Sequence, residues 1–297
     1  MLELKNISLS VEDEFTGNGQ KEILRDVSLT IETGKLVVVT GPNGGGKSTM
    51  AKMIAGILKP NQGQILLDGE DLLKADKKRI REIRGGIISY VPQGGGASMN
   101  PLLKVGFQVG EPLMEHRGYS KKAAEKDSVG LLKRFNVGNE EKIAKAYPHM
   151  LSGGMRQRAM VAMGISAGPR IILADEPTKG LDERRIRMVA DALNQLKEET
   201  LLCVTHDMKF AKAVGDKISV MYAAQQLEYG TAAQVLEHPL HPYTQALISN
   251  CASIDLDEKR EPIRIEGEPP SPVDPKPCCP FAGRCFCEQE ICRREKP

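Results

Sequence analysis

A continuous β-branched run, Leu36 to Thr40, leads directly into a glycine-rich loop and then into a helical pattern from Ser48 to Leu58. Such a run is typical of a strand buried on both faces. Because glycines lack a Cβ, successive backbone N–H groups of the loop can point at an anion, and the helix adds the positive end of its dipole. The order strand, loop, helix therefore predicts a phosphate-binding loop rather than a chance glycine-rich turn. Its residues are Gly41, Pro42, Asn43, Gly44, Gly45, Gly46, Lys47, Ser48 and Thr49.

Lys47 and Ser48 carry the side-chain chemistry of this loop. In such loops the lysine contacts the β- and γ-phosphates of a nucleotide, and the hydroxyl ligates Mg²⁺. The sequence therefore predicts a bound nucleoside triphosphate with Mg²⁺.

Two further apolar runs, Ile171 to Ala174 and Leu201 to Thr205, each end at polar residues. Asp175 and Glu176 follow the first run, and His206 follows the second. This is the habit of a parallel α/β sheet, whose ligands bind beyond the carboxyl ends of the strands. We therefore expect both carboxylates at the sheet edge near the phosphates. A solvated acidic turn is the alternative for this segment taken alone.

Composition limits the partners. The chain has 297 residues and a formal net charge of +2, which suggests one large or two small domains and gives nucleic acid little support as the main partner. Its apolar runs are far shorter than the ~18–20 residues that cross a bilayer, and Met1 to Lys5 does not resemble a signal peptide. We expect a soluble intracellular chain that other subunits recruit to any membrane.

The chain is organised around an α/β core. Leu2 to Val11 and Ile23 to Ile31 alternate as strands of an antiparallel edge subdomain. The character changes after Gln93, where a loop and a helical stretch, Lys121 to Phe135, predict a helical subdomain inserted at about 94–165. From Glu228 to Leu247 we expect turns and a short helix.

Beyond Cys251 the sequence becomes proline-rich, which predicts an extended connector. We therefore place a nucleotide-binding domain at 1–250 and a C-terminal extension at 251–297. In an intracellular protein, clustered cysteines indicate metal ligands before disulfides, and reduced surface thiols are the alternative. The extension contains Cys278, Cys279, Cys285, Cys287 and Cys292.

The segment Leu151 to Arg158 reads LSGGMRQR. Together with the phosphate loop upstream and Asp175-Glu176 downstream, it resembles the ATP-binding subunit of an ABC transporter, whose signature motif is LSGGQ. The resemblance covers nearly the whole chain and implies a P-loop NTPase with a RecA-like parallel sheet. It also implies a dimer, because the signature closes over ATP held by a partner's phosphate loop.

The resemblance implies a role for each motif residue. Asp175 orients Mg²⁺, Glu176 is the general base for the attacking water, and His206 reads the γ-phosphate. Gln93 resembles the Q-loop glutamine that touches Mg²⁺, and Asp182 matches the D-loop residue that contacts the opposite site. The resemblance also implies that Ser152, Gly153 and Gly154 form the signature clamp and that Phe15 stacks on adenine. The residues implied for Mg²⁺ are Ser48, Gln93 and Asp175.

Ser152 also has a simpler interpretation, as an ordinary helix N-cap. Both interpretations can hold, because capping and phosphate binding use the same helix-end amides.

Two segments narrow the resemblance to the ATPases of peptide and nickel importers. They are Met99-Asn100-Pro101 and His241 to Leu247, although Gly94 to Gly96 replaces an acidic residue and a proline that this branch usually has. Members of the branch carry a [4Fe–4S] cluster in their cysteine-rich end, and four thiolates suit iron–sulfur or zinc. Cys279, Cys285 and Cys292 match the pattern, with the fourth ligand open between Cys287 and Cys278.

The expected function is an ATPase that powers import of short peptides, nickel or metal chelates. The resemblance implies a second ATPase subunit, two membrane permeases and an extracytoplasmic binding protein. It places the chain on the cytoplasmic face of the cell membrane, as a peripheral subunit. This branch usually pairs two different ATPases, which favours a heterodimer over a homodimer.

Two other function classes compete with import. A soluble ABC ATPase acting mechanically on DNA or ribosomes usually has two cassettes or long coiled coils, and this sequence has one cassette without heptad runs. A regulatory module that holds ATP without hydrolysing it is disfavoured by the presence of Glu176 and His206.

Overall fold

The computed structural model describes residues 1–12, 19–93, 98–194, 196, 199–251, 261–273 and 275–295. The chain forms two compact units. The first comprises 1–31, 37–73 and 206–297, and the second comprises 32–36 and 74–205. The phosphate loop belongs to the first unit, and the Asp175-Glu176 pair belongs to the second.

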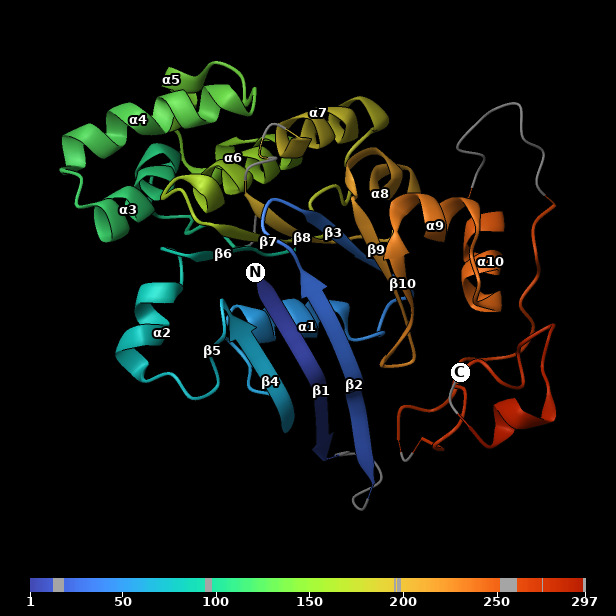
Figure 1. The fold of residues 1–297 in the computed structure, drawn as a ribbon. Helices are drawn as coiled ribbons and strands as arrows, with labels where there is room; N and C mark the ends of the chain where they lie inside the picture. Colours follow the sequence, from blue (N-terminus) through green and yellow to red (C-terminus); the bar gives the residue numbers. More distant parts are fainter. Residues whose placement is uncertain are drawn as a thin grey trace. The chain divides into compact units, whose positions relative to one another are not determined.

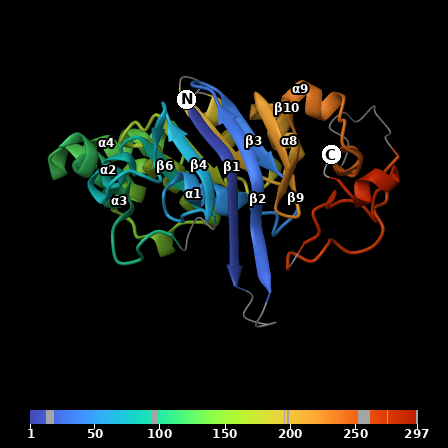
Figure 2. The ribbon, with the colours of Figure 1, turned by 60° about the horizontal axis from the view of Figure 1, so that its bottom comes forward.

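An antiparallel sheet opens the first unit, in the order β2-β1-β4-β5. Figures 1 and 2 show its long strands, β1 and β2, side by side. The predicted alternation is confirmed in part. Leu2 and Leu4 of β1 and Val27, Leu29 and Ile31 of β2 are buried in alternation, but the β1–β2 register shifts between Leu4 and Ile7, so Ile7 is buried out of that period. The strands are β1 (Leu2–Glu12), β2 (Gln20–Ile31), β4 (Gln62–Leu67) and β5 (Glu70–Asp71).

Strand β3 (Leu36–Thr40) is buried along its whole length, as the β-branched run predicted, and pairs in parallel with β9 (Lys217–Tyr222). Strand β10 (Gln225–Thr231) returns antiparallel along the other edge of β9. The expectation of turns from Glu228 was wrong, because this segment completes β10. The helices of the unit are α1 (Lys47–Ile54), α8 (Met208–Val214), α9 (Ala232–Glu237) and α10 (Pro242–Ser249).

Helix α1 is shorter than its predicted range. Gly56 adopts a left-handed φ of 69°, and its N–H donates to the carbonyl of Met53 at 2.9 Å. A glycine in this conformation is a common helix end, so residues up to Leu58 continue as turns.

In the second unit β7 (Ile171–Asp175) lies between β6 (Ile88–Val91) and β8 (Thr200–Val204), and both pairings are parallel. Parallel strands with every residue of β7 and β8 buried confirm the sequence expectation. Short helices α2 (Lys77–Ile83) and α7 (Glu183–Asn194) also belong to this unit.

The expected helical segment is present within 94–165. It contains α3 (Val105–Arg117), α4 (Lys121–Arg134), α5 (Glu140–Lys145), a 3-10 turn η1 (Pro148–Met150) and α6 (Gly153–Ile165). Helix α6 packs on β6 and also contacts α3 and α4. The contact with β6 is close, since a Cβ on Gly164 would lie 2.5 Å from Cγ2 of Val91.

The described part of the C-terminal extension contains one short 3-10 element, η2 (Glu290–Arg293), and is otherwise turns and extended chain. This agrees with the proline-rich connector that the sequence predicted. No helix in the described segments is both long and apolar enough to cross a bilayer.

Candidate functional site

The phosphate loop joins β3 to α1, and its glycines are required by close contacts with neighbouring strands. A Cβ on Gly41, whose φ is +135°, would lie 2.0 Å from the carbonyl oxygen of Met221. A Cβ on Gly46 would lie 2.5 Å from the carbonyl oxygen of Ile23. Gly44 also has a positive φ, of +77°, but faces open space. At its two ends the loop therefore packs against neighbouring strands so closely that a side chain would collide with their carbonyls.

The first turn of α1 presents its amides without a side-chain cap. Gly46 is the N-cap residue, no acidic side chain lies in the first turn, and Ser48 and Thr49 are partly exposed there. Helix-end amides together with the positive end of the helix dipole make this a suitable anion site. Lys47 is buried, and its Nζ donates to the carbonyls of Gly41 (2.9 Å) and Pro42 (2.7 Å). The loop thus brings an ammonium and backbone donors together.

His206 belongs to the same unit as the loop and is exposed. It precedes α8, whose N-cap is Asp207, with the carboxylate accepting from the N–H of Phe210 at 3.0 Å. The cap fixes the chain immediately after His206 and leaves the imidazole accessible.

The carboxylates lie at the carboxyl end of β7 in the second unit. Asp175 is 1% exposed and Glu176 is 5% exposed. Glu176 has a φ of +50°, a conformation that costs a non-glycine residue about 1–3 kcal/mol. Its N–H donates to the carbonyl of Val204 at 2.8 Å, so pairing with β8 holds this turn in place. The acidic pair is therefore a buried, rigid feature, and a solvated acidic turn is wrong.

Tyr90 is a site residue that the sequence reasoning missed. Its hydroxyl donates to Oδ2 of Asp175 at 3.0 Å. Tyr90 pairs with Leu173 on β7, so its side chain shares a sheet face with Asp175 two residues further on. Burial, and then the charge of Asp175, raise the pKa of Tyr90 well above its usual value, which keeps the phenol protonated as a donor. The only sequence signal was its place on the strand that leads to Gln93.

Gln93 is exposed two residues after β6 and is the last described residue before 98. The segment links it through Val91 and Pro92 to Tyr90, and hence to Asp175. Gln93 thus follows a strand of the unit that contains the acidic pair, and its contact with Mg²⁺ stays a prediction.

The signature segment forms the start of α6. Ser152 is its N-cap, with Oγ accepting from the N–H of Met155 at 3.3 Å, so the simpler interpretation of this serine is confirmed. Ser152 and Gly153 are exposed, and a Cβ on Gly153 would meet no atom within 4 Å. The exposed helix end remains open to an anion.

Asp182 is tied to the signature through Arg185. The N–H of Arg185 donates to Oδ1 of Asp182 at 3.0 Å, and Nη1 pairs with Oδ2 at 3.2 Å. The same arginine packs on the signature, because a Cβ on Gly154 would lie 3.3 Å from its Cδ. The second unit thus brings together two of the predicted partner-facing residues.

The cysteine tail places two of its candidate ligands close together. Cys279 is buried, and its N–H donates to the carbonyl of Cys292 at 3.0 Å. Burial raises the pKa of the Cys279 and Cys285 thiols, while Cys287 is exposed. Over the described segments no three His, Cys, Asp or Glu side chains are placed to hold a metal ion. The metal centre therefore stays a prediction. Phe15, the expected adenine-stacking residue, lies outside the described residues.

Comparisons with known proteins agree with these features. The ABC transporter family model matches residues 24–179, and that of the oligopeptide/dipeptide transporter C-terminal region matches 227–292. The dipeptide transport ATP-binding protein DppD of Bacillus subtilis is 35% identical to this chain. The alignment covers 100% of this chain and 90% of the length of DppD. The oligopeptide transport ATP-binding protein OppD of Haemophilus influenzae is 34% identical, covering 99% and 91%.

A solved structure of an ATP-binding cassette is also similar. It is a dimer in a post-hydrolysis state bound to ADP and Pi, with a TM-score of 0.72 and 30% identity. The alignment covers 78% of this chain and 99% of that cassette.

Proposed function

Because the chain belongs to the ABC transporter family of ATPases, we propose that it is the ATP-hydrolysing subunit of an importer of short peptides. The main support for this proposal is the match of residues 227–292 to the oligopeptide/dipeptide transporter C-terminal region. The two relatives, named for dipeptide and oligopeptide transport, support the same substrate class. A nickel substrate has no such support and stays a prediction from sequence alone.

In the first unit the phosphate loop would bind ATP. The glycine-rich loop packed against β2 and β9, the α1 amides and the Lys47 ammonium together fit a triphosphate. Residues 41–49 are assigned to this role, and His206 to contact with the γ-phosphate. The stacking role of Phe15 is part of the same proposal.

In the second unit Asp175 and Glu176 would carry the hydrolytic chemistry. Mg²⁺, when bound, would neutralise charge on the phosphate oxygens. Each residue proposed for Mg²⁺ carries an oxygen of the kind that this ion prefers: the Ser48 hydroxyl in the first unit, and the Gln93 side-chain amide and the Asp175 carboxylate in the second. Tyr90 would position that carboxylate through its hydrogen bond to Oδ2.

Glu176 would accept the proton of the attacking water. A general base contributes roughly 10²–10⁴ in rate. Its fixed backbone, held by the bond to Val204, would keep the carboxylate in place through the cycle. Ser152, Gly153, Gly154 and Asp182 would serve a nucleotide bound to a partner ATPase.

The partners follow from the transporter assignment. We propose two membrane permeases, an extracytoplasmic binding protein and a second, non-identical ATPase, with this chain peripheral on the cytoplasmic face of the membrane. A mechanical role on DNA or ribosomes has no supporting observation, whereas the relatives with transport names span the full chain.

The proposal also includes a [4Fe–4S] or zinc centre at Cys279, Cys285 and Cys292, with Cys287 or Cys278 as the fourth ligand. The backbone bond between Cys279 and Cys292 favours it by placing two of the candidates side by side. Anaerobic purification followed by iron, zinc and sulfide analysis of the full chain tests it directly, and a metal-free product would remove it.

The proposed function is tested by capture from native membranes, with the full-length chain as bait and mass spectrometry as readout. We expect two multi-span permeases, a second ATPase and a binding protein. Captured ATPase activity should rise when short peptides and the binding protein are added. Recovery of ribosomes or DNA-associated proteins without a membrane partner would overturn transport.

A further inference from the structure

The described part of the C-terminal extension is docked on β2 rather than trailing from the ATPase unit. The N–H of Glu22 donates to the carbonyl of Pro272 at 2.8 Å, and Lys21 forms an antiparallel bridge with Val273. The proline-rich chain thus pairs with the outer edge of β2. A proline lacks the N–H, so its contribution to such pairing is its carbonyl.

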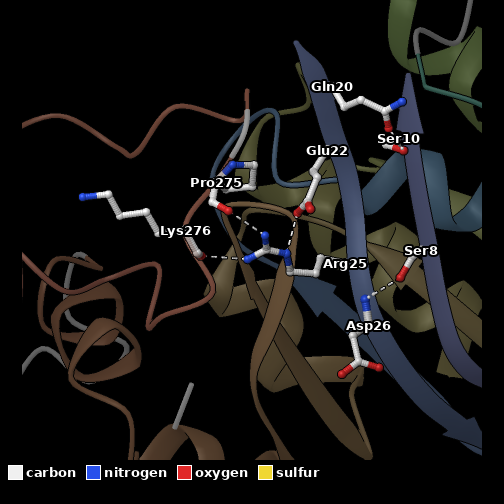
Figure 3. A network of polar contacts seen from close by, with 8 residues as sticks. All are labelled: Ser8, Ser10, Gln20, Glu22, Arg25, Asp26, Pro275 and Lys276. Carbon is white, nitrogen blue, oxygen red and sulfur yellow. Dashed lines mark hydrogen bonds and ion pairs between the residues drawn. The ribbon is translucent and has the colours of Figure 1, made fainter. Parts of the chain in front are cut away.

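Arg25 reinforces this pairing with a fork of hydrogen bonds. Its Nη2 donates to the carbonyl of Pro275 at 2.9 Å and its Nη1 to that of Lys276 at 3.0 Å, while Nε pairs with Oε2 of Glu22 at 2.6 Å (Figure 3). The planar guanidinium suits two successive carbonyls, which a lysine could not bridge in the same way.

A second anchor lies at the end of β9. Nη1 of Arg284 donates to the hydroxyl of Tyr222 at 2.7 Å. Phe281 is fully buried and packs edge-on against Tyr222 and Tyr243, with ring centroids 5.5 Å apart in both pairs. Aromatic pairs of this edge-on geometry stabilise a contact beyond the effect of the buried area alone.

Each anchor adjoins one end of the phosphate loop. On β2, Glu22 and Arg25 hold the extension, and the two residues between them, Ile23 and Leu24, come within 2.5 Å of the Cβ position of Gly46. At the end of β9, Tyr222 holds the extension, and the preceding Met221 has its carbonyl 2.0 Å from the Cβ position of Gly41.

A cavity of about 520 Å³ lies between the extension and the loop. One side is formed by Pro42 to Gly45 and the turn at Ala223-Ala224, and the other by residues of the extension that include Pro272 and Cys278. The extension therefore reaches the loop through the two strand segments, with open space between them.

We propose that the C-terminal extension supports the phosphate loop and sets its affinity for nucleotide, with Arg25 and Arg284 as positioning residues. The support acts through β2 on Gly46 and through the end of β9 on Gly41. At both places the contact leaves no room for a methyl group, so a shift of either strand segment changes the space that the loop can occupy. The inference rests on the proposed function in that the loop binds ATP.

The test compares Arg25→Ala, Arg284→Ala and the double variant with the wild type, all as full-length chains. We expect the Kd for Mg-ATP to rise roughly 3- to 10-fold, as for substitutions that act through intervening contacts. KM should rise with it, while kcat at saturating ATP stays near the wild-type value because no catalytic group is touched. Amide hydrogen exchange in residues 41–49 should become faster.

Two further variants keep the result interpretable. Arg187→Ala removes an exposed arginine that pairs with Glu183 on α7, and it should change neither Kd nor exchange. Tyr222→Phe removes only the hydroxyl that accepts from Arg284 and retains the ring contacts. This variant should raise the Kd for Mg-ATP by a smaller factor. It provides the test of the proposal if the arginine variants fail to fold.

The outcomes separate the two proposals. If the wild type binds no ATP, the proposed function fails. If the wild type binds ATP and the variants release the extension to limited proteolysis without changing Kd or exchange in the loop, the extension is a docked appendage and the inference is overturned.

Discussion

The phosphate loop and the acidic end of β7 are built in opposite ways. The loop is a backbone structure, in which Gly41 and Gly46 are required because neighbouring carbonyls occupy the space of a Cβ. The acidic end is a side-chain structure, in which Asp175 and Glu176 are buried and fixed by Tyr90 and Val204. The phosphate loop should therefore be sensitive to substitutions that add atoms. The acidic end of β7 should be sensitive to substitutions that remove a charge or a hydrogen bond.

The largest effect should come from removing charge at the acidic end. Glu176→Gln keeps the shape of the side chain but removes the base, so we expect kcat to fall by roughly 10²–10⁴ while the Kd for ATP is unchanged. Single-turnover hydrolysis and equilibrium nucleotide binding measure the two quantities. Normal hydrolysis by this variant would show that Glu176 is not the base.

Adding one methyl group to the loop should be the next largest effect, and it should depend on position. Gly41→Ala places a Cβ against the Met221 carbonyl at a φ of +135°, so we expect a loss of at least ~3 kcal/mol in unfolding free energy, with loss of ATP binding. Gly44→Ala meets no neighbour, so only the left-handed backbone costs about 1–2 kcal/mol.

Urea denaturation and ATP titration of both glycine variants check this order. Equal losses at the two positions would contradict the conclusion that close contact, rather than backbone conformation alone, selects glycine at Gly41.

Tyr90→Phe should give an intermediate effect on the acidic end. A hydrogen bond to a charged group contributes about 1.5 kcal/mol or more, so its loss should weaken the dependence of ATP affinity on Mg²⁺ roughly tenfold. ATP titrations with and without Mg²⁺ give this ratio directly, independently of turnover.

Tyr229→Phe is the matched control, because its hydroxyl donates at 2.7 Å to the carbonyl of Thr30, on the antiparallel sheet of the first unit. An equal loss of Mg²⁺ dependence in both variants would mean that Tyr90 acts on folding rather than on Asp175.

The smallest effect is expected at the signature, which combines a side chain with helix-end amides. Ser152→Ala and Ser120→Ala each remove an N-cap, on α6 and α4, so each should lower the unfolding free energy by about 1 kcal/mol. Only Ser152→Ala should also lower ATP turnover in the assembled transporter. Unchanged turnover would leave Ser152 with its capping role alone.

The sequence was sufficient where chemistry and geometry share one short segment. The loop from Gly41 to Ser48 between a strand and a helix, the acidic pair at a strand end and the capping serine have the local structure that was predicted, because strand, loop and helix patterns surround them. The buried run of β3 was recognised for the same reason.

The sequence was insufficient to predict contacts that join segments far apart in the chain. Tyr90 could not be assigned to Asp175, because their proximity depends on the register of β6 with β7. The docking of Arg25 on the carbonyls of Pro275 and Lys276 also left no signal, since a backbone carbonyl is the same in every residue. The strand β10 was missed because its partly exposed residues have no clear alternation.

The contact between Gly164 and Val91 has a consequence for the timing of the cycle. Because a Cβ on Gly164 would lie 2.5 Å from Cγ2 of Val91, the helix that starts with the signature packs closely on the strand that leads to Gln93. We therefore expect α6 and β6 to move together. A displacement of the signature during the cycle should therefore reach the strand before Gln93 in the same step. A bulkier residue at position 164 should therefore disturb both the signature at the start of α6 and the Gln93 segment after β6. A defect in the function of one should be accompanied by a defect in the function of the other.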